Sequence, residues 1–237
     1  MPTIDLAGTA VEYEVRHSSE ATKPRIDAGI NDITVVIPED MDLDPAELLQ
    51  EKQDWVLDKK EKYDDYLAKI PDREFEDGAI LPFLGEGHTI RVVDQQKREI
   101  RDGEIRLPAR RVEESSIKEQ VEKLYRTEVK QLIHAKVGEY IDRIDGDYDT
   151  LYIRDQKTKW GSCSGQDNLS FNWRLVMAPE YVLDYVVVHE LAHLEHRDHS
   201  EQFWQRVNDL LPEYQKGMSW LEENSYRLVF NRDEVIS

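Results

Sequence analysis

The stretch HELAHLEHRDHS, residues 189–200, decides how the second half of this chain folds, because it holds four of the chain's seven histidines. In the pattern H-E-x-x-H, two histidines four positions apart share one face of an α-helix, and only a helix brings both imidazoles to one metal ion. His189 and His193 are therefore candidate metal ligands, and we expect a helix over about 179–196, with Pro179 in its first turn.

A hydrolytic zinc site needs a third protein ligand and an open fourth position. On a straight helix, His196 would lie about 10 Å along the axis from His189, from a rise of about 1.5 Å per residue. That is too far for Zn–N bonds of about 2.0–2.1 Å. A bend after His193, which Asp198 favours as a turn former, would instead bring His199 back to the metal and leave His196 as a bystander.

Other features bear on the third ligand. The spacing of His189, His193 and His199 matches the template H-E-x-x-H-x-x-G-x-x-H, although a histidine stands where that template has glycine. A carboxylate on a later helix, Glu222 or Glu223, is the alternative third ligand.

Zinc, one ion per chain, is the expected metal, because three neutral imidazoles suit it and it is redox-silent. Zinc lowers the pKa of a bound water toward neutrality and polarises the bond under attack. Glu190, next to His189 on the helix, could take the proton of that water. Glu190 is therefore the candidate catalytic residue and not a ligand.

Two strands joined by the turn SGQDN precede the helix, in KWGSCSGQDNLSFNWRLVMAP, residues 159–179. A strand edge beside a metal-binding helix often pairs with the backbone of an extended substrate. Trp160, Gly161, Ser162 and Cys163 are therefore candidate substrate-binding residues. Cys163 is the chain's one cysteine, and without a CxxC partner it is predicted to be a small packed or edge residue.

The pieces KWGSCS, FNWRL and APEYVLDYVVVHELAHLEHRDHSEQFW resemble the YgjP-like metallopeptidase family, which is related to SprT-type and minigluzincin-like zinc peptidases. The matching positions are Trp160 to Ser164, Asn172 and Trp173, His189 to His193, His199 and Ser200, and Phe203 and Trp204. The resemblance implies His199 as third ligand and Glu190 as the catalytic residue. Asn172, one of the matching positions, is also a candidate substrate-binding residue. It leaves the substrate open.

The order of elements predicts an α+β fold. Residues 1–112 are expected to form a β-rich region of small antiparallel sheets with a linking helix over about 45–70, as one long helix or two short ones. The segments GEG (85–87) and RDGE (101–104) are expected to form hairpin turns. Residues 113–237 are expected to form a zincin-like catalytic domain. Its predicted parts are a long amphipathic helix from Ser115 or Ser116, a short sheet, the H-E-x-x-H helix, and helices at about 201–211 and 213–228.

The composition limits the partners. The formal charge is −19, from 50 acidic and 31 basic residues, and such a surface repels phosphate backbones and anionic membranes. No apolar run approaches the length of a membrane span. With one cysteine and no signal peptide, we expect a cytoplasmic protein that acts on a peptide or protein and binds no nucleic acid tightly.

Three functions compete. A zinc metallopeptidase, with water activated by Glu190, fits the motif best. The alternative is a metal-dependent nucleotide (pyro)phosphohydrolase, an activity that has been attributed to a member of the YgjP-like family that this sequence resembles. Against it, the sequence has no P-loop and few cationic residues near the histidine motif. A non-catalytic module with structural zinc would need a fourth ligand, such as Cys163, His196 or a carboxylate.

Overall fold

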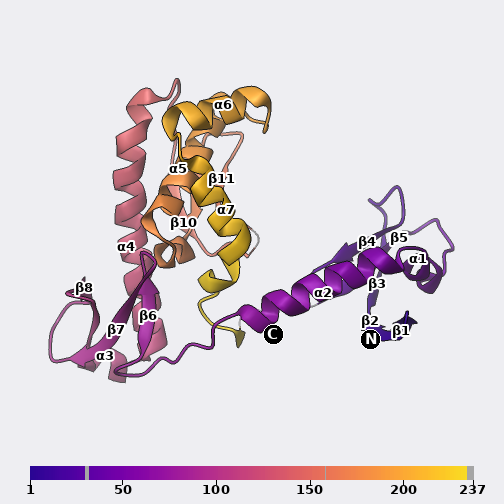
Figure 1. Cartoon of the computed structure of the whole chain (residues 1–237), viewed down its shortest axis with the longest axis horizontal. Helices are drawn as coiled ribbons and strands as arrows, with labels where there is room; N and C mark the ends of the chain where they lie inside the picture. Colours follow the sequence, from indigo (N-terminus) through magenta and orange to yellow (C-terminus); the bar gives the residue numbers. More distant parts are fainter. Residues whose placement is uncertain (30–31, 158, 234–237) are drawn as a thin grey trace. The chain divides into compact units, whose positions relative to one another are not determined.

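The computed structural model describes residues 1–29, 32–157 and 159–233, and its internal contacts divide the chain into two compact units. The first unit holds residues 1–71 with the chain from 231 onward, and the second holds residues 72–230 (Figure 1). The expected boundary after residue 112 falls inside the second unit. None of the described helices is both long enough and apolar enough to span a membrane.

The first unit contains a hairpin, a three-stranded sheet and two helices. Its elements are β1 (Thr3–Leu6), β2 (Thr9–Glu12), β3 (Glu14–Ser18), β4 (Arg25–Ala28), β5 (Ile33–Pro38), α1 (Pro45–Glu51) and α2 (Gln53–Lys69). The Asp44 side chain accepts the Ala46 N–H at 2.9 Å and so caps α1. Of the two forms expected for the linking segment, one long helix or two short ones, the structure has two helices, which meet at Lys52.

The second unit begins with a four-stranded sheet and a long helix. Its first elements are β6 (Ile80–Phe83), β7 (Glu86–Val93), β8 (Glu99–Arg101), β9 (Glu104–Pro108), α3 (Ala109–Glu113), α4 (Ile117–Tyr140) and η1 (Ile141–Arg143). Ser116 caps the start of α4, where the long helix was predicted to begin, and its hydroxyl accepts the Glu119 N–H at 3.1 Å. Leu81, Ile90 and Ile105 belong to the same buried core as Tyr125 of α4. This shared core explains why the chain does not divide after residue 112.

The rest of the second unit carries the histidine motif. It consists of β10 (Leu151–Arg154), β11 (Gly161–Cys163), β12 (Leu169–Asn172), η2 (Trp173–Met177), α5 (Glu180–Glu195), α6 (Glu201–Leu210), α7 (Tyr214–Asn224) and η3 (Ser225–Leu228). The sequence KTKWGSCS, residues 157–164, predicts a strand, and β11 forms its later part. Thr158 in this stretch lies outside the described residues. The α+β class predicted from the sequence is confirmed.

Strand pairing differs from the antiparallel sheets predicted for residues 1–112, because the three-stranded and four-stranded sheets there are mixed. The later short sheet, for which no pairing was predicted, is mixed as well. In each, three consecutive strands take the order first, third, second: β3-β5-β4, β7-β9-β8 and β10-β12-β11. The third strand pairs antiparallel with the second and parallel with the first. The second strand lies at an edge of the sheet, and the third strand lies between the first and the second. Because the third strand runs opposite to the second, it has the same direction as the first and pairs with it in parallel.

The helix that carries the motif is held on several sides. α5 packs against α4, α6, α7 and β11, and its middle is buried from Val186 to Val188. On α4, the nearly buried Lys136 ammonium contacts Asp184 at 2.6 Å and Glu180 at 3.0 Å. These ion pairs fix the first turns of α5 against the long helix.

Candidate active site

The bend predicted after the H-E-x-x-H motif is present. α5 ends at Glu195, and His196 takes an extended conformation with φ −129° and ψ 109° while its N–H still donates to the Ala192 carbonyl at 2.9 Å. The Asp198 carboxylate accepts the Ser200 N–H at 3.2 Å, and α6 begins at the next residue. The chain therefore turns back within five residues of the end of α5.

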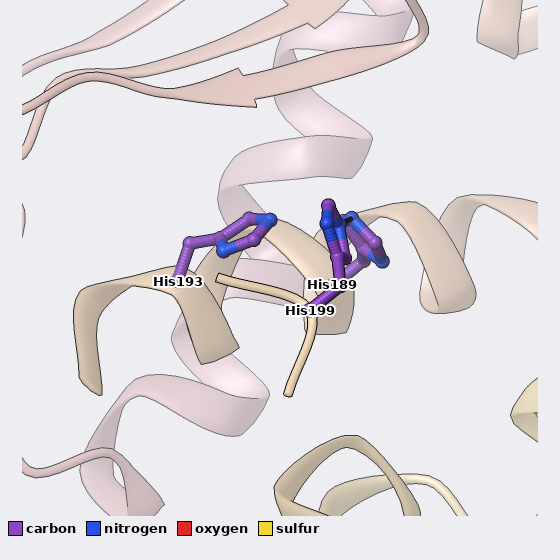
Figure 2. Close-up of side chains that lie close together, drawn as sticks. All are labelled: His189, His193 and His199. Carbon is purple, nitrogen blue, oxygen red and sulfur yellow. Dashed lines mark hydrogen bonds between the residues drawn. The ribbon is translucent and has the colours of Figure 1, made fainter. Parts of the chain in front are cut away.

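His189, His193 and His199 come together at this bend (Figure 2). One ring nitrogen from each lies within 4.8 Å of the others, and the Nε2 atoms of His189 and His199 are 3.1 Å apart. Tetrahedral zinc with Zn–N bonds of about 2.0–2.1 Å holds its nitrogens roughly 3.3 Å apart. Among the described residues, no other histidine, cysteine or carboxylate belongs to this group. Three protein ligands are the number found in catalytic zinc sites, which keep the fourth position open.

The protonation of the imidazoles suits a metal. His193 Nδ1 lies 2.9 Å from the His196 carbonyl, which leaves Nε2 free to face the group. His189 Nδ1 is enclosed and has no partner among the described residues. Burial, and then the neighbouring His193 and His199 rings, lower the pKa of His189 to about 3, and burial also lowers the pKa of His193. Neutral imidazole is the form that binds zinc, so this donor set fits the ion.

Glu190 lies on α5 between the first two histidines and is 4% exposed. Burial raises the pKa of its carboxyl to about 8, although Lys159 and the backbone N–H of Cys163 oppose the rise. A Cβ atom at Gly161 would lie 2.5 Å from Glu190 Oε1. The carboxyl group therefore fits against β11 only because the strand has glycine at this position.

β11 presents a free edge at the same place. The Trp160 carbonyl accepts the Asn172 N–H at 2.8 Å, and the Ser164 N–H donates to the Asn168 carbonyl at 2.9 Å. Backbone groups alternate between the two sides of a strand, so those of Gly161 and Cys163 face away from β12. β11 is the last strand in its sheet, so no strand among the described residues pairs with the outward backbone groups of Gly161 and Cys163. The Cys163 N–H instead interacts with the Glu190 carboxyl.

Comparison with known proteins identifies the family of this chain. The profile of the family described as "YgjP-like, metallopeptidase domain" matches residues 23–224. The chain belongs to the YgjP-like metallopeptidase family. A search of curated proteins found no match.

Crystal structures similar to this YgjP-like chain include two metallopeptidase zymogens. That of Pyrococcus abyssi abylysin has 19% sequence identity, covers 43% of this chain and 99% of its own, and has a TM-score of 0.34. That of Methanocaldococcus jannaschii jannalysin has 19% identity, covers 38% of this chain and 93% of its own, and has a TM-score of 0.29.

The remaining predicted substrate-binding residues of this YgjP-like chain differ in their surroundings. Trp160, Ser162 and Cys163 line hollows next to the histidines. Asn172 is 2% exposed, and its amide donates to the carbonyls of Gln156 at 2.7 Å and Lys159 at 3.1 Å. Its oxygen accepts a backbone N–H as well. These bonds make Asn172 a support for the segment that leads into β11.

Arg197 was not among the residues predicted from the sequence. Its guanidinium donates to the Ser164 carbonyl at 2.7 Å, lies 3.2 Å from Cys163 Sγ, and pairs with Asp167. It thereby ties the bend that carries His199 to the turn between β11 and β12. Burial raises the pKa of the Cys163 thiol, which fits the packed residue predicted there. The sequence showed only that a cationic residue stands two positions before His199. The partners of Arg197 could not be predicted, because they lie 30 to 34 residues away in the sequence.

Proposed function

We propose that this YgjP-like chain is a zinc-dependent peptidase that cleaves an extended peptide lying along β11. The supporting observation is the meeting of three metal-binding imidazoles, a buried carboxyl and an unpaired strand edge at one place. A nucleotide hydrolase would not need that edge. A closed structural zinc site would need a fourth ligand in the histidine group.

His189, His193 and His199 would hold one zinc ion. When bound, zinc supplies Lewis acidity and a water of lowered pKa. Glu190 accepts the proton of the attacking water, and the same carboxyl then donates it to the amine that leaves. Burial among α5 and β11 excludes bulk water from this carboxyl and raises its pKa in the metal-free chain. A zinc ion at the histidines would favour the ionised carboxylate, which is the form that accepts a proton.

Gly161 and Cys163 would bind the substrate backbone. Their outward N–H and carbonyl groups would continue the sheet by one strand, as in other proteins that bind extended peptides. The Cys163 N–H is partly engaged by Glu190, so Gly161 provides the open donor. This pairing places a peptide carbonyl next to Glu190 and orients it for attack.

Glu190→Gln tests the proposal. The variant keeps the shape of the side chain and leaves the imidazoles intact, so zinc content measured by elemental analysis should stay near one ion per chain. Hydrolysis of a mixed peptide library should fall by about 10²–10⁴-fold, as expected for loss of a general base.

Nucleoside triphosphates incubated in parallel with both proteins provide the comparison. Peptide cleavage that Glu190→Gln retains would remove Glu190 from the mechanism. Triphosphate hydrolysis without peptide cleavage would replace the peptidase proposal by the nucleotide alternative.

A further inference from the structure

A cavity of about 540 Å³ opens beside Glu190 and His189. Its walls come from α5, α6, α7 with η3, and the segment that enters β11. Pockets that bind small molecules commonly have volumes of roughly 300–1,000 Å³, so a cavity of this size has ample room for a large side chain.

One face of α7 forms a wall. Met218, Leu221 and Ser225 line the cavity, and their spacing places them on the same side of a helix. Just before them, a Cβ atom at Gly217 would lie 2.5 Å from Tyr185 Cβ. This close approach brings α7 onto α5 and directs the face that follows toward the cavity.

Aromatic and aliphatic groups supply most of the remaining surface. Trp160 and Trp204 lie on the walls, while Tyr185 and Val186 are buried beneath them at 8% and 3% exposure. Tyr214 stacks on both Trp204 and Tyr185, with ring centroids 5.6 and 6.5 Å apart. The stack holds the Trp204 and Tyr185 walls in fixed positions, so the cavity presents a firm apolar surface.

The charges that line the cavity balance. Apart from Glu190, the charged lining residues are Lys159 and Glu222, one of each sign, and both are exposed. A charged side chain of either sign would meet one like and one opposite charge, so the lining offers no net attraction to offset the cost of removing that charge from water. The cavity therefore favours an uncharged occupant.

We propose that this cavity is the specificity pocket of the enzyme and receives a large uncharged apolar side chain, such as that of Phe, Tyr, Trp, Leu or Met, next to the bond that is cut. The inference rests on the proposed peptidase function. Its physical basis is that His189 and Glu190 line both this cavity and a second hollow of about 270 Å³ that contains His193 and His199. A peptide bond positioned at Glu190 thus has a neighbouring side chain at the mouth of the larger cavity.

A cleavage-site profile tests this pocket. The zinc-loaded full-length chain is incubated with a mixed library of peptides, and the products are sequenced by mass spectrometry. One position adjacent to the cut bond should be enriched in large apolar residues. Cleavage sites with no such enrichment, or with Lys or Arg there, would overturn the inference while leaving the peptidase proposal intact.

Filling the cavity should change the profile. Ser225→Phe puts a ring into the cavity, and the matched control Ser219→Phe makes the same change at an exposed position of α7 outside it. Ser225→Phe should lower kcat/KM for peptides with Phe at the enriched position by about 10- to 100-fold relative to Ala peptides, as expected for loss of one large apolar contact. Equal selectivity in the two variants would overturn the inference.

Binding gives a readout that does not depend on turnover. Blocked tripeptide amides with central Phe, Ala or Lys are titrated against metal-free protein, and the intrinsic tryptophan fluorescence, to which Trp160 and Trp204 contribute, is followed. The Phe amide should bind about tenfold more tightly than the other two, and Ser225→Phe should remove the difference. Selective binding without any cleavage by the zinc-loaded enzyme would keep the pocket and reject the peptidase proposal, whereas equal binding would reject the pocket.

Discussion

His196 and His199 stand three residues apart, yet they have different roles. His199 joins the group formed by His189 and His193, whereas His196 contributes its backbone carbonyl to His193 Nδ1. That carbonyl fixes which nitrogen of His193 carries the proton. A residue whose side chain is a bystander thus still orients a ligand through its main chain.

His199→Ala should therefore abolish stoichiometric zinc binding, because only two imidazoles remain. His196→Ala keeps its carbonyl and should retain about one ion per chain. Elemental analysis after dialysis against trace zinc measures both. Zinc retained by His199→Ala and lost by His196→Ala would show that the ligand set is different.

Glu190 should make the metal-free protein less stable at higher pH. Burial raises the pKa of this carboxyl from 4.5 to about 8 in the folded state. A raised pKa means that its contribution to stability is complete below pH 4.5 and is lost as the pH rises through about 8. Glu190→Gln should therefore gain stability over wild type as the pH rises across this range.

Urea unfolding in the presence of EDTA, at several pH values, measures the difference. Glu223→Gln, at an exposed carboxylate of α7, is the control and should follow wild type. A constant difference between Glu190→Gln and wild type from pH 4.5 to 8 would contradict the assigned pKa.

At the scale of elements, the site depends on how closely α5 approaches β11. The contact between Glu190 and Gly161 leaves no space for a methyl group. Gly161→Ala should shift the carboxyl and lower kcat/KM by about 10²-fold, the usual effect of a displacement near 1 Å, while zinc content stays unchanged. Gly165→Ala is the matched control, since a Cβ there meets nothing within 4 Å. Equal activity of the two variants would mean that Glu190 needs no such positioning.

The sequence predicted those parts of the site that depend on local spacing. His189 and His193 follow from helix periodicity, and the bend that carries His199 follows from turn residues close to it. The contacts of Glu190 with Gly161, and of Arg197 with the turn after β11, join segments about 30 residues apart. Periodicity carries no information about such distances. For the same reason the sequence did not predict that α7 lines the cavity. The helical spacing of Met218, Leu221 and Ser225 indicates one face of a helix but not what that face contacts.

At the scale of the whole molecule, the second unit carries both the site and its own core. The buried cluster that contains Phe171 and Val187 also includes Leu81 and Ile105. Residues 72–230 expressed alone should therefore unfold cooperatively in urea and bind about one zinc ion. A fragment that starts at residue 113, the boundary predicted from the sequence, should lack this cooperativity because it loses part of the core. The same unfolding curve for both fragments would contradict this assignment.

The order of strands β10-β12-β11 has a further consequence. β12 is paired on both sides and passes through η2 directly into α5, so the helix with His189 and His193 starts from the best-anchored strand of the sheet. β11 is paired on one side, over three residues. The strand that would receive a peptide is therefore the less firmly hydrogen-bonded of the two, and its position depends on its side contacts, Gly161 against Glu190 and Ser164 with Arg197. A substrate that shifted β11 would move the catalytic carboxyl and the His199 bend before it moved the anchored start of α5.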